Sequence, residues 1–104
     1  MAKVKNIDST NFDEEVLNFN GKVIVDLWAA WCAPCRMIAP VIEALSEEFP
    51  EVKFVKINVD DNQDTAAKYG VSSIPTILAF ENGTMYKRSV GFKPADLLKQ
   101  DLDL

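Results

Sequence analysis

The sequence contains no histidine, which removes several kinds of active site from consideration. Cys–His and Ser–His nucleophile pairs, histidine-ligated metal sites and a histidine general base are all excluded, because each needs an imidazole. The two cysteines are too few for the disulfide-rich scaffold of a small secreted domain. No apolar run approaches the roughly 20 residues of a membrane span, and no basic segment followed by an apolar one opens the chain. We therefore expect no membrane segment and no secretory leader.

Basic residues are also in the minority, with 11 Lys and Arg against 16 Asp and Glu, so the formal net charge is -5. This acidic balance disfavours nucleic acid and anionic membranes as partners, since both bind basic patches. The 104 residues, 48% of them apolar, suffice for one domain with a buried core but not for two. We expect a cytoplasmic, monomeric protein with a single domain over residues 1–104.

Apolar residues switch between strand-like and helix-like spacing along the chain. Strand-like runs cover residues 4–7, 23–28, 52–59, 76–80 and 85–90. Helical spacing follows Asn11, Pro34, Asn62 and Pro94. This order predicts an α/β fold with a central mixed β-sheet, parallel in its first half, antiparallel at a final hairpin, and flanked by helices on both faces.

Polar residues and prolines mark where these elements begin, end or bend. Asn11 with Glu14 is a capping-box variant, and Asn62 is placed to cap the third helix. Pro40 lies inside the second helical pattern and is expected to kink or split that helix. An Asn-Gly pair at 82–83 separates the last two strands, which is the strongest short-range signal for a β-hairpin.

Both cysteines lie in one short motif, Trp31-Cys32-Ala33-Pro34-Cys35, where a buried strand ends and a helix begins. Residues three apart on a helix face each other at roughly 5–6 Å, which is within reach of a disulfide. A loop this small removes little entropy from the unfolded chain, so the bridge is expected to serve chemistry rather than stability. Free N–H groups and the helix dipole favour a thiolate at a helix N-terminus. We therefore predict that Cys32 is the exposed, attacking thiol and that Cys35, one turn deeper, resolves.

Two other interpretations of the cysteine motif remain open at this point. Half of a zinc site would need further ligands from another subunit, because this chain has no third cysteine and no histidine. A pair of buried, unreactive cysteines is the second alternative, since free cysteine is commonly buried. The position of the motif beside a βαβ pattern favours redox chemistry and no metal.

One carboxylate, Asp26, stands in the middle of an apolar run that extends from Val23 to Trp28. Burying a carboxylate is costly unless it is paired or protonated, so a buried Asp26 would mark a functional group. An aspartate that faces water from an edge strand would fit the same pattern. The residues alone leave both alternatives open.

Residues spread over the whole chain match the pattern of one known family. They are Phe12, Asp26, Trp28, Trp31-Cys32-Ala33-Pro34-Cys35, Pro40, Lys56, Asp60, Ile74-Pro75-Thr76, Gly83 and Gly91. On these residues the chain resembles the thioredoxin family, which implies the thioredoxin fold and a dithiol–disulfide oxidoreductase that reduces disulfides in other proteins. The resemblance implies no cofactor besides the Cys32–Cys35 disulfide. It also implies a separate electron donor of the thioredoxin reductase type, because the chain carries no dinucleotide fingerprint of its own.

The resemblance also assigns roles to residues around the cysteines. Asp26 would lie beneath Cys35 and move the proton of that thiol, with Lys56 nearby to tune the charge of the acid. The Ile74–Pro75 bond would be cis and face the cysteines, although only roughly 5–6% of X–Pro bonds in folded proteins are cis. The backbone of Ile74 would then pair with an extended target segment.

An apolar rim around the disulfide completes the expected site. We expect the target-binding residues to be Trp31, Ala33, Pro34, Ile74, Pro75 and Gly91. Trp28 and Pro40 are expected to be structural residues near the site rather than target contacts, because aromatic side chains are most often part of a core.

Ala33 departs from the family, which usually has glycine there, and this leaves the redox potential and the set of partners open. Oxidising relatives often carry histidine between the cysteines, which favours the reduced thiolate and makes the disulfide a stronger oxidant. Alanine and proline stand there in this chain, so a reductant is the better interpretation. A disulfide oxidase or isomerase, and a binding module that keeps the fold as a clamp, are the alternatives.

Overall fold

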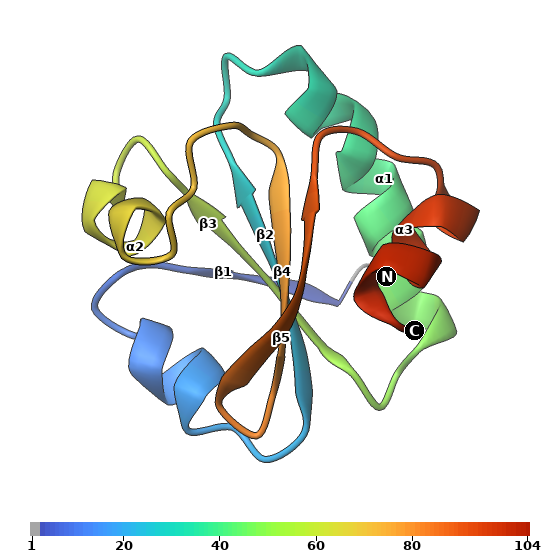
Figure 1. The fold of residues 1–104 in the computed structure, drawn as a ribbon, viewed down its shortest axis with the longest axis horizontal. Coiled ribbons are helices and arrows are strands. Elements are labelled where there is room, and N and C mark those ends of the chain that lie inside the picture. The colour runs from blue at the N-terminus through green and yellow to red at the C-terminus, as the bar shows by residue number, and fades with distance from the viewer. Residues whose placement is uncertain (1–2) are drawn as a thin grey trace.

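A five-stranded mixed sheet forms the centre of the computed structural model, which describes residues 3–104 (Figure 1). Its strands are β1 (Val4–Ile7), β2 (Lys22–Trp28), β3 (Lys53–Asn58), β4 (Thr76–Glu81) and β5 (Thr84–Val90). They lie in the order β1-β3-β2-β4-β5. β3 pairs in parallel with β1 and β2, whereas β4 pairs antiparallel with β2 and β5. The predicted sheet, parallel in its first half and closed by an antiparallel hairpin, is confirmed.

Helices cover both faces of this sheet. In the described part of the chain they are the π-helix η1 (Asp13–Leu17) and the α-helices α1 (Ala33–Glu48), α2 (Gln63–Lys68) and α3 (Ala95–Leu102). Figure 1 shows α1 and α3 together on one side of the sheet, with α2 on the other. Each of the four helices begins within two residues of the position expected from the sequence.

Side chains of β2 alternate between the two faces and thereby place its one carboxylate. Val23, Val25 and Leu27 pack in the core on the side of η1, whereas Ile24 packs with side chains of α1 and α3 on the opposite side. Because successive residues of a strand point to opposite faces, Asp26 shares the face of Ile24. The carboxyl group therefore lies on the sheet face that α1 covers.

Two predicted helix caps are wrong in their hydrogen bonds. The side-chain oxygen of Asn11 accepts from the backbone N–H of Asp8 at 2.9 Å instead of capping η1. Asn62 does precede α2, but its Oδ1 accepts from the backbone N–H of Ser9 at 2.8 Å, and its Nδ2 donates to the Asn58 carbonyl. Asparagine side chains form hydrogen bonds with the backbone of turns as readily as with the backbone at helix ends. These two residues therefore stabilise loops rather than helix starts.

Helix α1 runs without interruption past its internal proline. The expectation that Pro40 splits this helix is wrong, because one helix spans both sides of it, and a kink there stays a prediction. The apolar side chain of Met37 is 56% exposed. The buried stripe is set by Ile38, Ile42 and Leu45, which recur at helical spacing, and Met37 lies one position around the helix from it.

The predicted hairpin turn at 82–83 is present, and it packs against η1. Both of its residues have positive φ, 50° at Asn82 and 85° at Gly83. A Cβ atom at Gly83 would lie 2.5 Å from the backbone oxygen of Leu17. The glycine is therefore required both by the turn conformation and by the closeness of η1.

Gly83→Ala should destabilise the fold by about 1–3 kcal/mol more than Gly70→Ala, because it adds a steric clash to the cost of positive φ. Gly70 is a matched control, since its φ is also positive (63°) and a Cβ there would meet nothing within 4 Å. Urea unfolding of the two variants measures the difference. Equal losses of stability would contradict the close packing of this turn against η1.

Candidate active site at the N-terminus of α1

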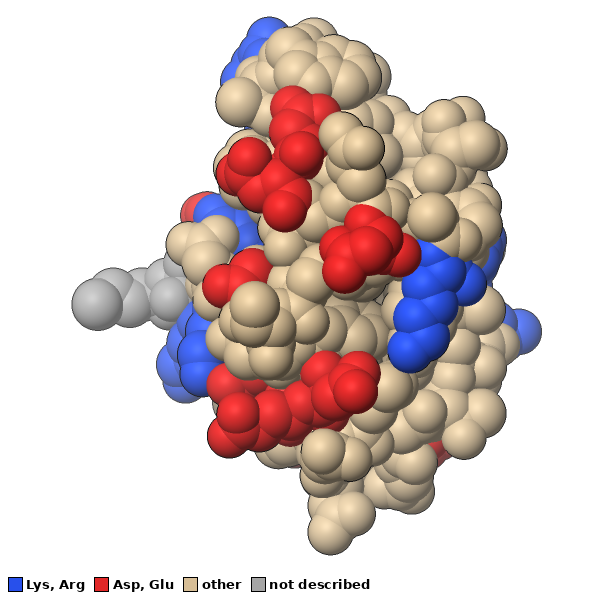
Figure 2. All heavy atoms as spheres, turned by 90° about the vertical axis from the view of Figure 1, so that its left-hand side faces the viewer, with Lys and Arg blue, Asp and Glu red and all other residues tan. Residues whose placement is uncertain are grey.

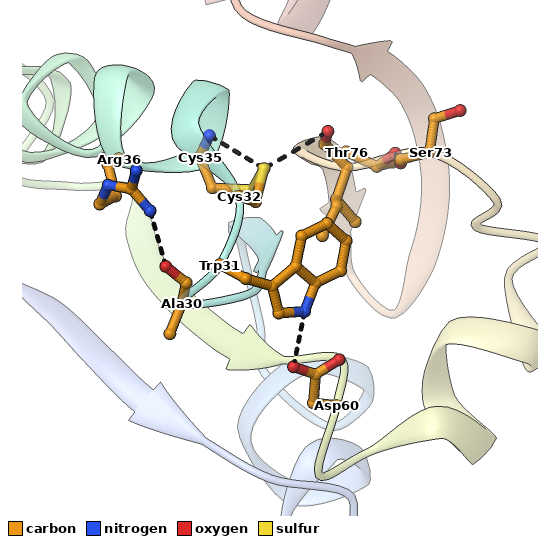
Figure 3. Close-up of a disulfide and its surroundings, with 9 residues drawn as sticks. Ala30, Trp31, Cys32, Cys35, Arg36, Asp60, Ser73 and Thr76 are labelled. Atoms are coloured by element: carbon orange, nitrogen blue, oxygen red, sulfur yellow. Dashed lines mark hydrogen bonds between the residues drawn. A yellow bond between two sulfur atoms is a disulfide. The ribbon is translucent and has the colours of Figure 1, made fainter.

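Cys32 and Cys35 form a disulfide at the start of α1, with their Cα atoms 5.2 Å apart (Figure 3). Cys32 is the N-cap residue, and its Sγ accepts a hydrogen bond from the backbone N–H of Cys35 at 3.2 Å. A capping serine or aspartate would accept the same kind of bond from the free N–H groups of a first helical turn. The sulfur of Cys32 thus occupies the position where the helix best stabilises negative charge.

Exposure does not distinguish the two cysteines in this disulfide form. Cys32 is 4% exposed and Cys35 is 3% exposed, so the expectation of an exposed Cys32 is wrong here. Their surroundings do differ. The Sγ atom of Cys32 lies 3.7 Å from the carbonyl oxygen of Ile74, whereas Cys35 lines a pocket together with Asp26.

The segment from Ile74 to Pro75 approaches the disulfide as the family resemblance implied. The Ile74–Pro75 peptide bond is cis, which confirms that expectation. The backbone N–H of Gly91 donates to the carbonyl of Pro75 at 2.8 Å, so Gly91 is held beside this segment. Pro75 itself is buried, while Ile74 and Gly91 remain partly exposed at the rim.

Trp31 stands out from the surface next to the disulfide. Its side chain is 69% exposed, yet its Nε1 donates a hydrogen bond of 2.9 Å to Oδ2 of Asp60, as Figure 3 shows. Trp31 and Ile74 line a groove of about 340 Å³. Ala33 and Pro34 are exposed in the first turn of α1.

Asp26 lies between two neighbouring strands, so the edge-strand alternative is wrong. It pairs in register with Lys56 of β3 on one side and with Ile77 of β4 on the other, and it is 3% exposed. Burial raises the pKa of its carboxyl group to about 7, and the positive charge of Lys56 lowers it only in part. Its Oδ1 atom has no hydrogen-bonding partner among residues 3–104.

A pocket of about 290 Å³ brings this acid together with the inner cysteine. The residues that line it are Asp26, Trp28, Ala29, Ala30, Cys35, Arg36, Ala39 and Lys56. Trp28 is partly buried and packs against the cysteine pair, as expected of a structural residue. The Lys56 ammonium lies 5.9 Å from the centre of the Trp28 ring. Pro40 is exposed on α1 and does not line the pocket.

Two residues make contacts at the site that the sequence does not predict. Asp60 belongs to the family pattern, which assigns it no role here, and in the structure it orients Trp31. Arg36 was given none either, and its guanidinium donates to the Ala30 carbonyl at 2.7 Å, which ties α1 to the loop before it (Figure 3). Asp60 could have been found, because it follows β3, and the carboxyl ends of parallel neighbours such as β2 and β3 meet at one edge of a sheet.

Most of the face that carries β1 and α2 is uncharged, and acidic groups are its main charged groups. Figure 2 shows acidic groups across its middle and basic side chains nearer its margins.

Among residues 3–104, no cluster of three or more Cys, Asp or Glu side chains could hold a metal ion. No helix within that same range is long and apolar enough to cross a membrane.

The burial of Asp26 should make the free energy of unfolding depend on pH. The pKa of an unfolded aspartate is roughly 3.9, and that of the folded Asp26 is about 7. Between these values the folded chain binds more protons than the unfolded chain, so stability falls as pH rises from about 4 to about 7 and stays low above that. Asp26→Asn should abolish this fall and be the more stable protein above pH 7, by about 1.4 kcal/mol for each pH unit between the two pKa values.

Urea unfolding of the oxidised proteins at several pH values measures this effect. The matched control is Asp61→Asn, which changes an exposed aspartate at the same end of the sheet and should keep the pH profile of the parent. A profile of Asp26→Asn that runs parallel to that of the parent would contradict the burial of an ionisable group.

Known proteins match this chain over almost its whole length. The family model for thioredoxin matches residues 3–103. The chain is 50% identical over 101 residues to thioredoxin of Bacillus subtilis, covering 96% of this chain and 94% of that protein. It is 47% identical over 95 residues to thioredoxin of Haemophilus influenzae, covering 90% and 89%. It is 40% identical over 104 residues to thioredoxin of Synechocystis, covering 99% and 97%. The chain therefore belongs to the thioredoxin family, whose members are thiol–disulfide oxidoreductases, and its redox group is the Cys32–Cys35 disulfide.

Proposed function

We propose that the two sulfur atoms act in a fixed order when the protein reduces a target disulfide. In the reduced protein, the thiolate of Cys32 attacks one target sulfur, the target S–S bond breaks, and the other target sulfur leaves as a thiolate. The thiolate of Cys35 then attacks the sulfur of Cys32 in this mixed disulfide. The target leaves as a dithiol, and the Cys32–Cys35 disulfide is formed again.

The observation that carries this order is the different surroundings of the two sulfurs. Cys32 caps the helix and contacts Ile74 at the rim, where a target can approach. Cys35 instead lines the pocket that holds Asp26 and Lys56. A thiolate at the N-cap is stabilised by the helix, so Cys32 is the better first nucleophile at neutral pH.

In the proposed second step, Asp26 accepts the proton of Cys35. A general base works best when its pKa lies near the working pH. Burial raises the pKa of Asp26 to about 7, so near neutral pH the group exists in both forms and can take up a proton. Lys56 pairs with Asp26 in register and keeps part of the population ionised by its charge.

For target binding, we propose that an extended segment of the target pairs with the backbone of Ile74. Trp31, Ala33, Pro34 and Gly91 surround this position and would contact the flanking target residues. The groove between Trp31 and Ile74 offers room for one target side chain. Strand-like pairing of this kind gives affinity through the main chain and leaves target sequence largely free.

The protein can act repeatedly only if a partner reduces its disulfide after each turn. We propose a separate thioredoxin reductase-type enzyme as this electron donor, because the chain has no glycine-rich dinucleotide fingerprint. A protein that donates electrons works best in a reducing compartment, which supports the cytoplasm as its location. We propose that it acts as a monomer, since targets and reductase must both reach the same disulfide.

Cys35→Ser should trap target proteins as stable mixed disulfides, because its Cys32 still attacks but nothing resolves the product. Cys32→Ser should trap almost none, since the remaining thiol lies in the pocket rather than at the rim. Non-reducing gels with a protein substrate such as insulin measure the trapped fraction. Trapping mainly through Cys35 would overturn the proposed order.

Asp26→Asn should slow the resolution of the mixed disulfide more than the first attack, because an amide cannot accept the proton of Cys35. The loss of a general base costs about 100-fold or more in the step that depends on it. Stopped-flow measurements on the reduced protein separate the two steps. Equal rates of resolution in Asp26→Asn and the parent at neutral pH would show that Asp26 is not the base.

A further inference from the structure

The connection between β5 and α3 carries Gly91, one of the residues expected at the target-binding rim. It comprises residues 91–94, which follow the end of β5 and precede the start of α3. Figure 1 shows this connection at the end of the sheet where α1 begins. Gly91 has a positive φ of 87°, and its N–H donates to the carbonyl of Pro75 at 2.8 Å. The conformation of this loop therefore sets the shape of one side of the rim.

One carboxylate oxygen holds the connection on both sides of Gly91. Oδ2 of Asp101, in the last turn of α3, accepts a hydrogen bond from the Ser89 hydroxyl at 2.8 Å. The same oxygen accepts from the ammonium of Lys93, with which Asp101 forms an ion pair. Ser89 precedes Gly91 in the chain, and Lys93 follows it. The carboxylate thus joins the two ends of a segment, residues 89–93, that has Gly91 at its centre.

This anchor is partly shielded from water. Ser89 is 1% exposed, and the side chains of Lys93 and Asp101 are 33% and 32% exposed. Hydrogen bonds from Lys93 and Ser89 lower the pKa of Asp101, so its carboxylate is charged at neutral pH. Hydrogen bonds to a charged group are stronger than those between neutral groups. The anchor can therefore restrict the motion of the loop.

A loop centred on glycine benefits from such an anchor. Glycine loses more conformational freedom than other residues when it is ordered, so a free Gly91 would make target binding less favourable. The neighbouring apolar side chains, Val90 and Phe92, are 48% and 40% exposed and would have to be ordered as well. A segment that is already anchored has lost this freedom before a target arrives. Preorganisation of this kind raises affinity without adding a contact.

The attachment of α3 to the sheet does not depend on Asp101. Leu98 and Leu102 of α3 are fully buried in the core that α1 and the sheet share. A second ion pair, between Lys99 and Glu48 at 3.1 Å, joins α3 to α1. The ion pair of Asp101 differs from it because it reaches the loop that carries the rim. Its main effect is therefore expected on that loop.

We propose that Asp101 is a positioning residue for target binding, which holds the segment around Gly91 in place through Ser89 and Lys93. Asp101 acts through the loop and contacts neither the target nor the sulfur atoms. A loop released from Asp101 must be ordered each time a target binds, so targets bind more weakly while the chemical steps are unchanged. This role rests on the proposed function, because it assumes that Gly91 lies against the target, whereas the anchoring of the loop does not.

Amide hydrogen exchange, measured by NMR on the oxidised protein, tests the anchoring without any target. Asp101→Ala should speed the exchange of the Gly91 amide at least about threefold, since it removes two hydrogen bonds to a charged group. The matched control Lys99→Met breaks the other ion pair of α3 and should exchange at this amide like the parent. Equal exchange of Gly91 in Asp101→Ala and the parent would overturn the proposal.

Single-turnover reduction of insulin by the reduced protein tests the consequence for targets. Asp101→Ala should raise the half-saturating insulin concentration about three- to tenfold and leave the limiting rate within about twofold of the parent. The rate with hydroxyethyl disulfide should not change, because so small a molecule needs only the sulfur atoms. Lys99→Met should match the parent with both substrates. Equal losses with both substrates in Asp101→Ala, or an unchanged half-saturating concentration, would overturn the positioning role.

Lys93→Met tests whether the loop side of the anchor carries the effect. It should change exchange and half-saturation in the same direction as Asp101→Ala but less, because Ser89 still bonds to Asp101. The double variant should be no worse than Asp101→Ala alone, since both substitutions act through one interaction. Additive effects of the two substitutions would overturn the proposal.

Ile74→Asp separates a failure of this proposal from a failure of the proposed function. It places a charge at the rim and should raise the half-saturating insulin concentration, whatever Asp101 does. If Ile74→Asp has this effect while Asp101→Ala matches the parent, only the positioning role is overturned. If Ile74→Asp matches the parent, target binding at the rim is wrong, and the positioning role is overturned with it.

Discussion

The desolvation of one carboxyl group, Asp26, is the constraint on which the active site depends. The strands on both sides of β2 and the helix above it keep water away from this acid. Its pKa rises to about 7 as a result, and Lys56 offsets the rise only in part. A carboxylate in this position costs stability that an amide or an apolar residue would not cost. In the proposed mechanism, the burial that costs this stability also makes Asp26 a base that can exchange a proton with Cys35 near neutral pH.

The disulfide and the acid hold their relative positions because one stretch of chain carries both. Strand β2 places Asp26 on the face covered by α1, and the short loop of residues 29–32 then leads into that helix, whose N-cap is Cys32. Packing of Ile38 and Ile42 on the same sheet face holds the first turn of α1, and with it Cys35, over the pocket. Nothing in this arrangement needs a metal or an imidazole, which agrees with a chain that has no histidine.

The periodicity of the sequence was enough to predict the five strands, the four helices and the mixed sheet of residues 3–104, because buried faces repeat at fixed spacing. It could not decide whether Asp26 was buried, since an edge strand gives the same pattern, and only the pairing of β2 with both neighbours settles the matter. The cis bond before Pro75 came from the family resemblance alone. Asn62 stands at the predicted N-cap position, but its side chain bonds to Ser9, a residue 53 positions away that no local pattern reveals.

The pKa of Asp26 in the oxidised protein is the quantity that tests this account most directly. A pH titration of its side-chain carboxyl carbon by NMR, with Asp26→Asn to assign the resonance, measures it without any catalytic turnover. Burial in the central strand predicts a midpoint near pH 7. A midpoint near 4, the value of an aspartate in water, would show that the acid is solvated and would contradict both its burial and its proposed role as a base.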